Sequence, residues 1–516
     1  MFHWKNVTSL LWVLPIAFCA VTILTSCSDA ESDAEGGTRE EQAAKTSSIP
    51  DEARTLVSVM KNESYTPDEF LKHLGSPSMR AITENIQQYP TFVKINNLAS
   101  AFAKMKLNAH LPYLDSLFAA EVGTENDGTR RWRFESYTFT YKSVTSYGQS
   151  MEMSGRVTFP NNIVESKGHE VSTLSLHSHQ ELPDADCAPS ENLMFMSMRA
   201  MYNSAVIEPD FQNLGINYTK VFDGTGSAKA LTRQLVDCVI AALEVMHQHG
   251  VTLDPEGYTT NWGSSKNVAV PIGFAKYYET EAPQWFRDAI RLESTFTGEG
   301  EIDLGNVMPF YYQHPEFYPV IYYYTGCYLA GLTAKQLGGY EPKELLAPWF
   351  TNTIYHIGDK DYTALEALSL GLIKNGDPRL PEITRLDQIL ASDLLTPDGL
   401  MDESNPKGQA FLRGMSEESG VYGWEPTLPI YIAHCPYDEV IPYSCSREFY
   451  LQFSNQETNP AVRWVDVPYP ESLVEAANQD GISTLHVLVS FFMHLYMSCI
   501  KDPVDLAKMY DKRIEE

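Results

Sequence analysis

Cysteine is scarce in this sequence and is never closely spaced. The 516 residues contain 8 cysteines, and none forms a C-x-x-C pair, so the sequence gives no support for a zinc site of the finger or ribbon type. Cys19 lies in an N-terminal apolar run and Cys27 follows that run closely. The other six are widely separated, and the sequence does not choose among their many possible disulfide pairings.

Basic side chains are also in short supply. Lysine and arginine number 38 against 67 aspartates and glutamates, which gives a formal net charge of −29 at pH 7. A field of this sign repels phosphate backbones, so we expect no binding to nucleic acid. The chain is 43% hydrophobic and 12% aromatic, and this composition predicts a packed core rather than disorder.

The N-terminal apolar run is too short for a stable membrane span. It covers residues 10–23 and leads into the tetrapeptide L-T-S-C, which ends at Cys27. This tetrapeptide resembles the lipobox of bacterial lipoproteins. We therefore predict a signal peptide over residues 1–26 and lipid attachment at Cys27; the alternative is an ordinary secretory signal followed by a chance cysteine.

Residues 27–50 contain no aromatic side chain and many acidic and small ones, which is typical of a flexible tether. Acidic residues directly after a lipidated cysteine resemble a surface-export signal used by some Gram-negative bacteria, although plain linker composition explains them equally well. The expected location is the cell envelope, with a lipid anchor in the outer membrane; exposure at the cell surface is left open.

Hydrophobic patterning organises the rest of the chain. Residues 51–123 indicate short helices, one of which begins at Thr66, where a threonine can cap and Glu69 can reach back. From Trp132 the apolar period becomes two, which predicts an antiparallel strand pair with one face buried. That face carries Met151, Met153, Gly155, Val157 and Phe159.

Short apolar strands then alternate with helices. Strands are predicted at 171–177, 204–210, 258–262, 428–434 and 462–467, and Ser227 can cap a long amphipathic helix that ends near Gly250. This alternation predicts the α/β class: a mostly parallel central sheet with helices on both faces and ligand chemistry at the carboxyl ends of the strands. Residues 281–425 are largely helical in pattern and predict a cap between core segments 124–280 and 426–516.

The stretch Y-T-T-N-W-G-S-S-K-N, residues 258–267, has the pattern of a strand that turns sharply into a helix. In a nucleophile elbow such a turn exposes a strained residue above the sheet, and small residues are needed two positions before and after it. Ser265 as nucleophile has Gly263 before it, which fits, and Asn267 after it, which is larger than usual. In the rival register Gly263 is at the apex and there is no nucleophile.

An acid and a histidine follow in the order that this type of site uses. Asp438 comes after the strand at 428–434, and His486 opens an apolar helix near the C-terminus. His486 would act as general base toward Ser265, and Asp438 would fix the imidazole tautomer. Asp466 is the second candidate for the acid, and a capping or core role is the alternative for His486.

From about Trp132 to Cys499 the chain resembles the α/β-hydrolases of the secretory-lipase and esterase type, with a helical lid inserted before the acid. The segments that carry the resemblance are SGRVTFP, LSLHSH, AVIEPDFQNLG, GSSKN, WEPTLPIYIAH, DEVIPY and the LH at 485–486. The resemblance implies cleavage of a small-molecule or lipid-like carboxylic ester through an acyl-enzyme on Ser265, without a cofactor. It also implies an oxyanion hole made by backbone N–H groups of Lys266 and of Ser178 or His179.

The sequence departs from the family pattern at three places: Ser178 and Asn213 stand where glycine is usual, and Lys266 and Asn267 stand where the elbow usually has glutamine and glycine. Bulkier residues there can tilt the oxyanion donors or crowd the elbow. A degenerate hydrolase that keeps its pocket for ligand binding is therefore the alternative function. A surface interaction protein is a third interpretation, with no residues that favour it.

Two further patterns have a functional and a structural interpretation each. His177 and His179 form an H-x-H pair, but no carboxylate or histidine cluster completes a metal site, so we predict oxyanion-loop structure and no metal. The tyrosine-rich stretch 309–332 could line a substrate pocket or form a packed cap helix. The candidate pocket residues in it are Tyr311, Tyr312 and Tyr322.

Overall fold

The computed structural model describes residues 49–74, 104–118, 132–162, 169–178, 189–190, 193–212, 214–217, 227–264, 268–298, 300, 302–313, 342–348, 390–398, 402, 404–434, 441–453 and 461–466. Within these residues nine strands form one sheet, in the order β1-β2-β3-β5-β4-β6-β7-β8-β9. The strands are β1 Leu56–Tyr65, β2 Trp132–Val144, β3 Ser150–Asn162, β4 His169–His177, β5 Ser204–Pro209, β6 Val251–Ser264, β7 Leu292–Gly298, β8 Ile430–His434 and β9 Val462–Asp466.

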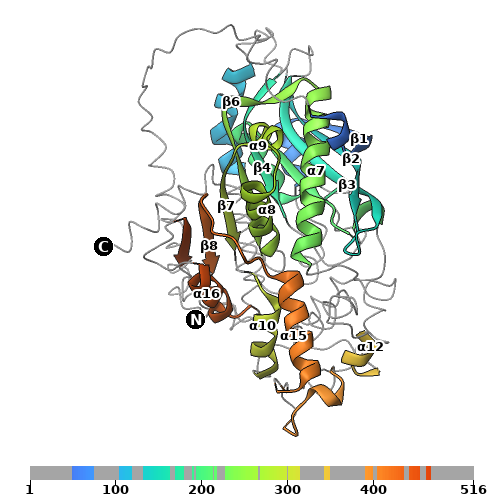
Figure 1. Cartoon of the computed structure of the whole chain (residues 1–516). Helices are drawn as coiled ribbons and strands as arrows, with labels where there is room; N and C mark the ends of the chain where they lie inside the picture. Colours follow the sequence, from blue (N-terminus) through green and yellow to red (C-terminus); the bar gives the residue numbers. More distant parts are fainter. Residues whose placement is uncertain are drawn as a thin grey trace, which may run out of the picture.

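The sheet is antiparallel at one side and parallel over the rest. Strands β1, β2, β3 and β5 pair antiparallel, whereas every pairing from β5 through β4, β6, β7 and β8 to β9 is parallel. The helices that Figure 1 labels are α7 Ala228–Gln248, α8 Ala269–Thr280, α9 Gln284–Ile290, α10 Leu304–Gln313, α12 Pro342–Leu345, α15 Pro406–Ser419 and α16 Tyr443–Phe453. This arrangement confirms the predicted class of a mostly parallel sheet with helices.

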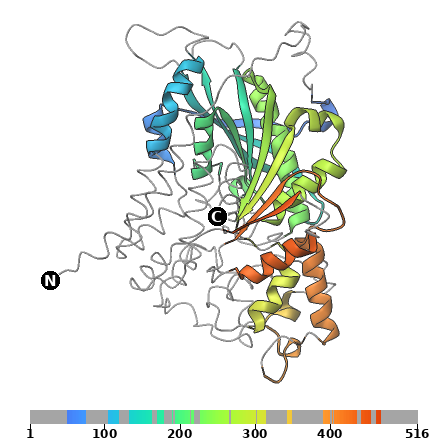
Figure 2. The same cartoon turned by 90° about the vertical axis from the view of Figure 1, so that its left-hand side faces the viewer.

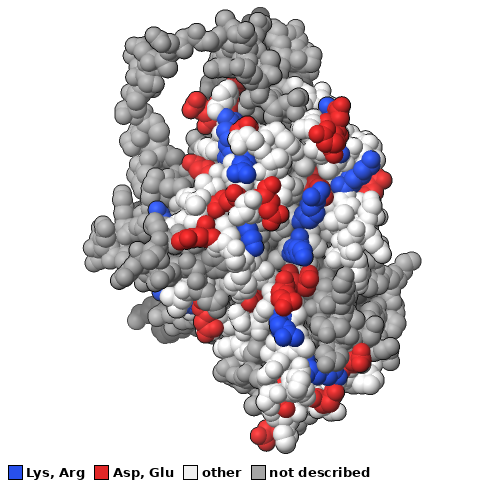
Figure 3. Space-filling view, viewed as in Figure 1, with Lys and Arg blue, Asp and Glu red and all other residues white. Residues whose placement is uncertain are grey.

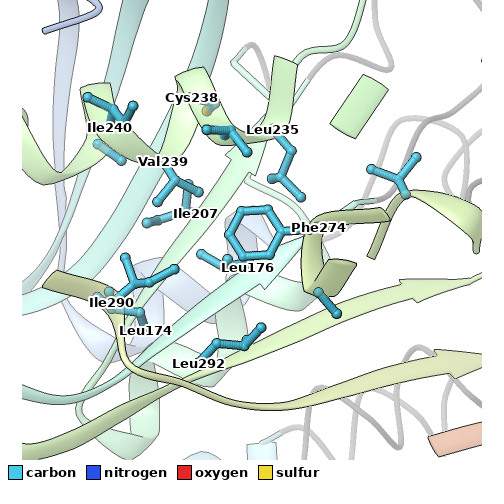
Figure 4. Close-up of a cluster of buried hydrophobic side chains, with 14 of the residues drawn as sticks. Leu174, Leu176, Ile207, Leu235, Cys238, Val239, Ile240, Phe274, Ile290 and Leu292 are labelled. Atoms are coloured by element: carbon cyan, nitrogen blue, oxygen red, sulfur yellow. The ribbon is translucent and has the colours of Figure 1, made fainter. Parts of the chain in front are cut away.

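Helix α7 supplies one wall of the main core. Its start is capped as predicted, because Ser227 Oγ accepts the backbone N–H of Ala230 at 3.2 Å. Its apolar face packs on the sheet (Figure 4), where the buried side chains that meet include Leu174, Leu176, Ile207, Leu235, Val239 and Phe274. At the crossing with β3, a Cβ on Gly155 would lie 2.8 Å from Cys238 Sγ, so a glycine is needed there for close approach.

The predicted hairpin of β2 and β3 is present, but the expectation of a single buried face is wrong. Ser154, Arg156 and Thr158 alternate with the apolar positions of β3 and are 0%, 1% and 0% exposed. They are buried under residues 189–190 and the 3-10 helix η4 (Phe195–Tyr202). Burial is tolerated because the polar groups are paired: Arg156 Nε donates to the carbonyl of Pro189 at 2.6 Å.

The N-terminal segment is less helical than predicted. Thr66 and Glu69 form the expected capping box at the start of helix α4 (Pro67–His73), and residues 104–118 are helical. Residues 56–65, however, form strand β1 at the edge of the sheet. Thr55 Oγ1 donates to the carbonyl of Asp237 in α7 at 2.7 Å, so this segment is part of the core rather than an appendage.

The predicted cap begins too early in the sequence. Residues 292–298 form strand β7, which lies between β6 and β8, so the core continues through Gly298. Helices α10 and α15 follow, and they lie side by side beyond the sheet (Figures 1 and 2). The helices crowd closely at Gly305, because a Cβ there would lie 2.0 Å from Ser416 Oγ.

The two ends of this cap region meet. Asp303, just before α10, accepts hydrogen bonds from Ser416 Oγ at 2.8 Å and from the hydroxyl of Tyr422. Tyr422 belongs to the chain that returns from the cap to β8, and its carbonyl accepts a hydrogen bond from Lys276 Nζ of α8 at 2.6 Å. The entry, the exit and helix α8 are thus tied together.

None of the helices formed by the described residues combines the length and the apolar character needed to cross a bilayer.

Candidate active site

Four parallel strands end at the same edge of the sheet, and the predicted site belongs to this edge. His177 pairs with Trp262, and Ser264 pairs with Gly298 of β7. Gly298 in turn lies opposite Ala433, one residue before the end of β8. The chain therefore leaves β4, β6, β7 and β8 side by side, which is where an open parallel sheet places its ligand chemistry.

The turn after β6 lies where the elbow was predicted. Strand β6 stays hydrogen-bonded to β7 through Ser264, and α8 begins at Ala269. Gly263 is paired with Thr297 in this strand and is not among the glycines with positive φ in the described residues. The rival register, with Gly263 at the apex, is therefore wrong. Ser265 and Lys266, as well as Asn267, lie outside the described residues.

Asn261 joins the strand to the helix that follows the turn. Its side-chain Nδ2 donates to the carbonyl of Pro271 at 2.9 Å, and the residue is fully buried. Pro271 is the third residue of α8, where the backbone nitrogen has no partner within the helix, so a proline there removes no helical hydrogen bond. The two ends of the strand–turn–helix unit are thus fixed to each other by a side chain.

Ser178, a predicted member of the oxyanion hole, has its backbone N–H hydrogen-bonded to strand β6. Its backbone N–H donates to the carbonyl of Trp262 at 2.8 Å, and the residue is 0% exposed. Its Oγ has no hydrogen-bond partner among the described residues. An N–H already paired in a sheet is not available to an oxyanion, so this donor role does not fit Ser178. His179, the other candidate, lies outside the described residues.

The side chains of His177 and Arg199 contact Trp262, near the end of β6. No sequence pattern predicted this group of contacts. The imidazole of His177 is stacked against Trp262, with ring centroids 6.3 Å apart. The buried guanidinium of Arg199 lies 4.4 Å from the centre of the same indole ring. Arg199 comes from a methionine-rich 3-10 helix, and no sequence signal marked it.

The P-D-x-x-x-x-G segment serves as support for neighbouring loops. Asp210 is fully buried and accepts hydrogen bonds from the hydroxyl of Ser154 and the backbone N–H of Ser190. Burial raises the pKa of the Asp210 carboxyl, and these hydrogen bonds oppose the rise. Gly215 has φ +58°, and a Cβ there would lie 2.0 Å from Asp210 Oδ2, which explains the glycine.

The acid and the base of the predicted triad are not among the described residues. Asp438 and His486 both lie outside them, and of Asp466 only the backbone is described, at the end of β9 opposite His434. His434 itself is buried, and both of its ring nitrogens have hydrogen-bond partners. A histidine held in this way is unsuited to proton exchange with a substrate.

The remaining predicted positions are only partly covered. Tyr311 and Tyr312 lie in the last turn of α10, while Tyr322 and Cys27 lie outside the described residues. Within the described ranges no group of three or more histidine, cysteine, aspartate or glutamate side chains is arranged to hold a metal ion. His177 of the H-x-H pair has its Nε2 2.9 Å from Ser175 Oγ.

Comparison with known structures identifies the fold. A candidate hydrolase of Legionella pneumophila superposes with a TM-score of 0.55 at 15% identity, over 83% of this chain and 98% of that one. The rice cell wall degrading esterase LipA of Xanthomonas oryzae, in a ligand-bound form, gives a TM-score of 0.55 at 14% identity, over 87% and 97%. No protein-family model and no curated protein matches the sequence. The chain has the α/β-hydrolase fold, as predicted.

Proposed function

We propose that this protein is a lipid-anchored serine hydrolase that cleaves carboxylic esters. The observation that carries the proposal is the position of the turn after β6. Strand β6 remains paired through Ser264, between β4 and β7, and α8 begins at Ala269; Ser265 is the next residue in the sequence after the paired end of β6. This is the position that a nucleophile takes in the α/β-hydrolase fold.

The proposed reaction uses the order of residues in the chain. His486 takes the proton of Ser265 as the hydroxyl attacks the ester carbonyl, and returns it to the leaving alcohol. Asp438 holds the imidazole in the required tautomer. The oxyanion accepts hydrogen bonds from the backbone N–H groups of Lys266 and His179. Water, activated by His486, then releases the acid from Ser265. Tyr311, Tyr312 and Tyr322 are proposed to line the acyl or alcohol pocket.

Support for an ester substrate comes from the neighbour of known chemistry, since LipA is an esterase and its structure matches most of this chain. The shared fold alone does not assign an activity. The sequence order Ser, Asp, His and the position of the turn are the features of this chain that make ester hydrolysis the best-supported function.

Labelling with a fluorophosphonate probe tests the nucleophile. We expect the wild type and Ser264→Ala to be labelled, and Ser265→Ala to remain unlabelled, because only a serine activated by a base reacts with the probe at a useful rate. Ser264 is a matched control, since it is the adjacent serine. Equal labelling of both alanine variants, or none of the wild type, would contradict the assignment.

The anchor is tested separately. Cells that express the full chain and are fed radiolabelled palmitate should yield a labelled protein in the outer-membrane fraction, and Cys27→Ser should abolish both properties. Cys19→Ser is the control, because Cys19 lies within the segment that is predicted to be removed. Label retained by the Cys27 variant would exclude this anchor.

A further inference from the structure

His434 ends strand β8 and is held on both sides of its ring. Nε2 lies 3.0 Å from the carbonyl oxygen of Ile441, and Nδ1 lies 2.9 Å from Ser446 Oγ. The Tyr443 ring is perpendicular to the imidazole, with ring centroids 5.8 Å apart and planes at 88°. His434, Ile441 and Ser446 are 0%, 1% and 1% exposed, so these bonds form away from water.

The hydrogen-bond chemistry fixes which atom donates. A carbonyl oxygen only accepts, so Nε2 must carry a proton and donate it to Ile441. Ser446 Oγ is 2.9 Å from Nδ1 and also 2.9 Å from the carbonyl of Gly300. Ser446 has one hydroxyl proton, so beside a neutral imidazole it donates either to Nδ1 or to the carbonyl of Gly300. Both hydrogen bonds form together only when the imidazole is doubly protonated and Nδ1 donates to Ser446 Oγ. In every protonation state of this chain of groups, the Nε2–H bond to Ile441 is retained.

The hydrogen bond between His434 and Ile441 spans a short part of the sequence. His434 and Ile441 flank residues 435–440 in the sequence, and the hydrogen bond between them joins the chain before these residues to the chain after them. Ser446 in α16 lies beside both the imidazole and Gly300, which follows β7. Residues 435–440 include Asp438, the proposed acid.

We propose that His434 is a positioning residue for the catalytic acid. It acts through Ile441, by fixing the two ends of the segment that carries Asp438 relative to the exit of β7. This inference rests on the proposed function, because it assigns a task to a segment whose importance follows from the triad. His434 does not touch the substrate in this scheme and exchanges no proton with it.

Two substitutions separate the contacts of the ring. A glutamine at this position can place its amide nitrogen where Nε2 lies and can still donate to Ile441, whereas an asparagine is shorter and reaches only toward Ser446. We therefore expect His434→Gln to resemble the wild type and His434→Asn to lose the bond to Ile441. Both side chains are polar amides, so the pair differs mainly in reach.

The test combines kinetics with hydrogen–deuterium exchange on the full-length chain. With p-nitrophenyl butyrate as substrate, we expect kcat of His434→Asn to fall about 10- to 100-fold with KM changed less than about twofold, since small displacements of catalytic groups have effects of this size. His434→Gln should stay within about threefold of the wild-type kcat. Amide exchange in peptides that cover residues 435–441 should accelerate in the asparagine variant alone.

The outcomes distinguish this inference from the proposed function. If the wild type is labelled by fluorophosphonate but both variants match it in kcat and in exchange, the role of His434 is overturned alone. The same holds if exchange accelerates in His434→Asn without loss of kcat. A wild type that is neither labelled nor active overturns the proposed function, and with it any catalytic task for His434.

Discussion

Individual polar side chains in this protein hold the backbone of distant segments. Asp210 binds the N–H of Ser190, Lys276 binds the carbonyl of Tyr422, and His434 binds the carbonyl of Ile441. In each case a side chain on a strand exit or helix fixes a loop. Removal of such a group leaves its buried partner unsatisfied, which costs about 1–3 kcal/mol.

Two glycines with positive φ allow steric crowding to be measured. Gly215 has φ +58° and no room for a Cβ beside Asp210, whereas Gly148 has φ +73° with no atom within 4 Å of a Cβ. We expect Gly148→Ala to lose about 1 kcal/mol from backbone strain, and Gly215→Ala to lose about 2 kcal/mol more because its neighbours must shift. Urea unfolding of both variants measures the difference; equal losses would refute the crowding argument.

His169 should make stability depend on pH. Burial lowers the pKa of its imidazole from the usual 6.5, opposed by the hydrogen bond to Asn203. The unfolded chain therefore binds a proton at a pH where the folded chain does not, and stability is lost as the pH falls below about 6.5. His169→Gln should reduce the loss of unfolding free energy between pH 7 and 5. The exposed His73→Gln is the control, and an unchanged slope for His169→Gln would contradict the prediction.

At the scale of helices and strands, the sequence predicted elements with strong patterning and missed two without it. The capped helix α7 and the apolar strands β4, β5, β8 and β9 were predicted close to their observed bounds. Strand β1 was missed because six consecutive residues, 57–62, are exposed, so no alternation marks it. Strand β7 has the sequence L-E-S-T-F-T-G and is buried at every residue except Glu293, so its buried positions do not alternate with exposed ones.

The sequence predicted the location of the candidate site but not the side chains that support it. The pattern of residues 258–267 predicted a strand followed closely by a helix, and β6 ends at Ser264 while α8 begins at Ala269. The supports of the site were not predictable: Arg199 on Trp262 and His434 on Ile441 are contacts between residues 63 and 7 positions apart by their numbering. Such contacts depend on how the elements pack, and a local pattern does not encode them.

Helix α8 is fastened to the chain that returns from the cap, and one carboxylate makes most of the connection. Glu279 accepts hydrogen bonds from Trp424 Nε1 at 2.9 Å and from the backbone N–H groups of Thr427 and Leu428 at 3.1 Å and 2.7 Å. Glu279→Ala should lose about 2 kcal/mol of unfolding free energy, because hydrogen bonds to charged groups are lost. It should also speed protease cleavage within residues 421–428.

The control for this prediction is Glu281→Ala on the same helix. Glu281 is exposed at the C-terminal end of α8, and a surface substitution of this kind usually changes stability by less than about 0.5 kcal/mol. Similar unfolding midpoints in urea for the two variants would show that the hydrogen bonds of Glu279 do not contribute to the free energy of unfolding.

On the scale of the whole molecule, one sheet unites segments from β1 to β9, and the N-terminal strand is part of it. The charge is not gathered in one place on the face that Figure 3 shows, where acidic and basic side chains of the described residues are interspersed. The formal net charge of −29 counts every residue of the chain, and a net charge of this size favours solubility.

Two truncations test whether β1 belongs to the core. A chain that lacks residues 1–48 keeps every described contact, so its urea midpoint should equal that of the mature protein. A chain that lacks residues 1–65 loses β1, together with the hydrogen bonds from Thr55 and Leu56 N–H to Glu244 in α7. It exposes the edge of β2 and should aggregate. Size-exclusion chromatography checks both, and a monomeric, equally stable second truncation would refute the assignment.

The contact between Asp303 and Tyr422 joins residues that are 119 positions apart. An insertion whose ends touch can be replaced by a short linker without a change in the scaffold on either side, since domain insertions are tolerated where the termini lie close together. Exchange at this boundary also has to preserve or replace the hydrogen bond from Ser227 Oγ, at the start of α7, to Glu418 of α15 at 3.0 Å. Chimaeras built at this boundary would join a foreign insertion to the sheet and to helix α8 of this chain.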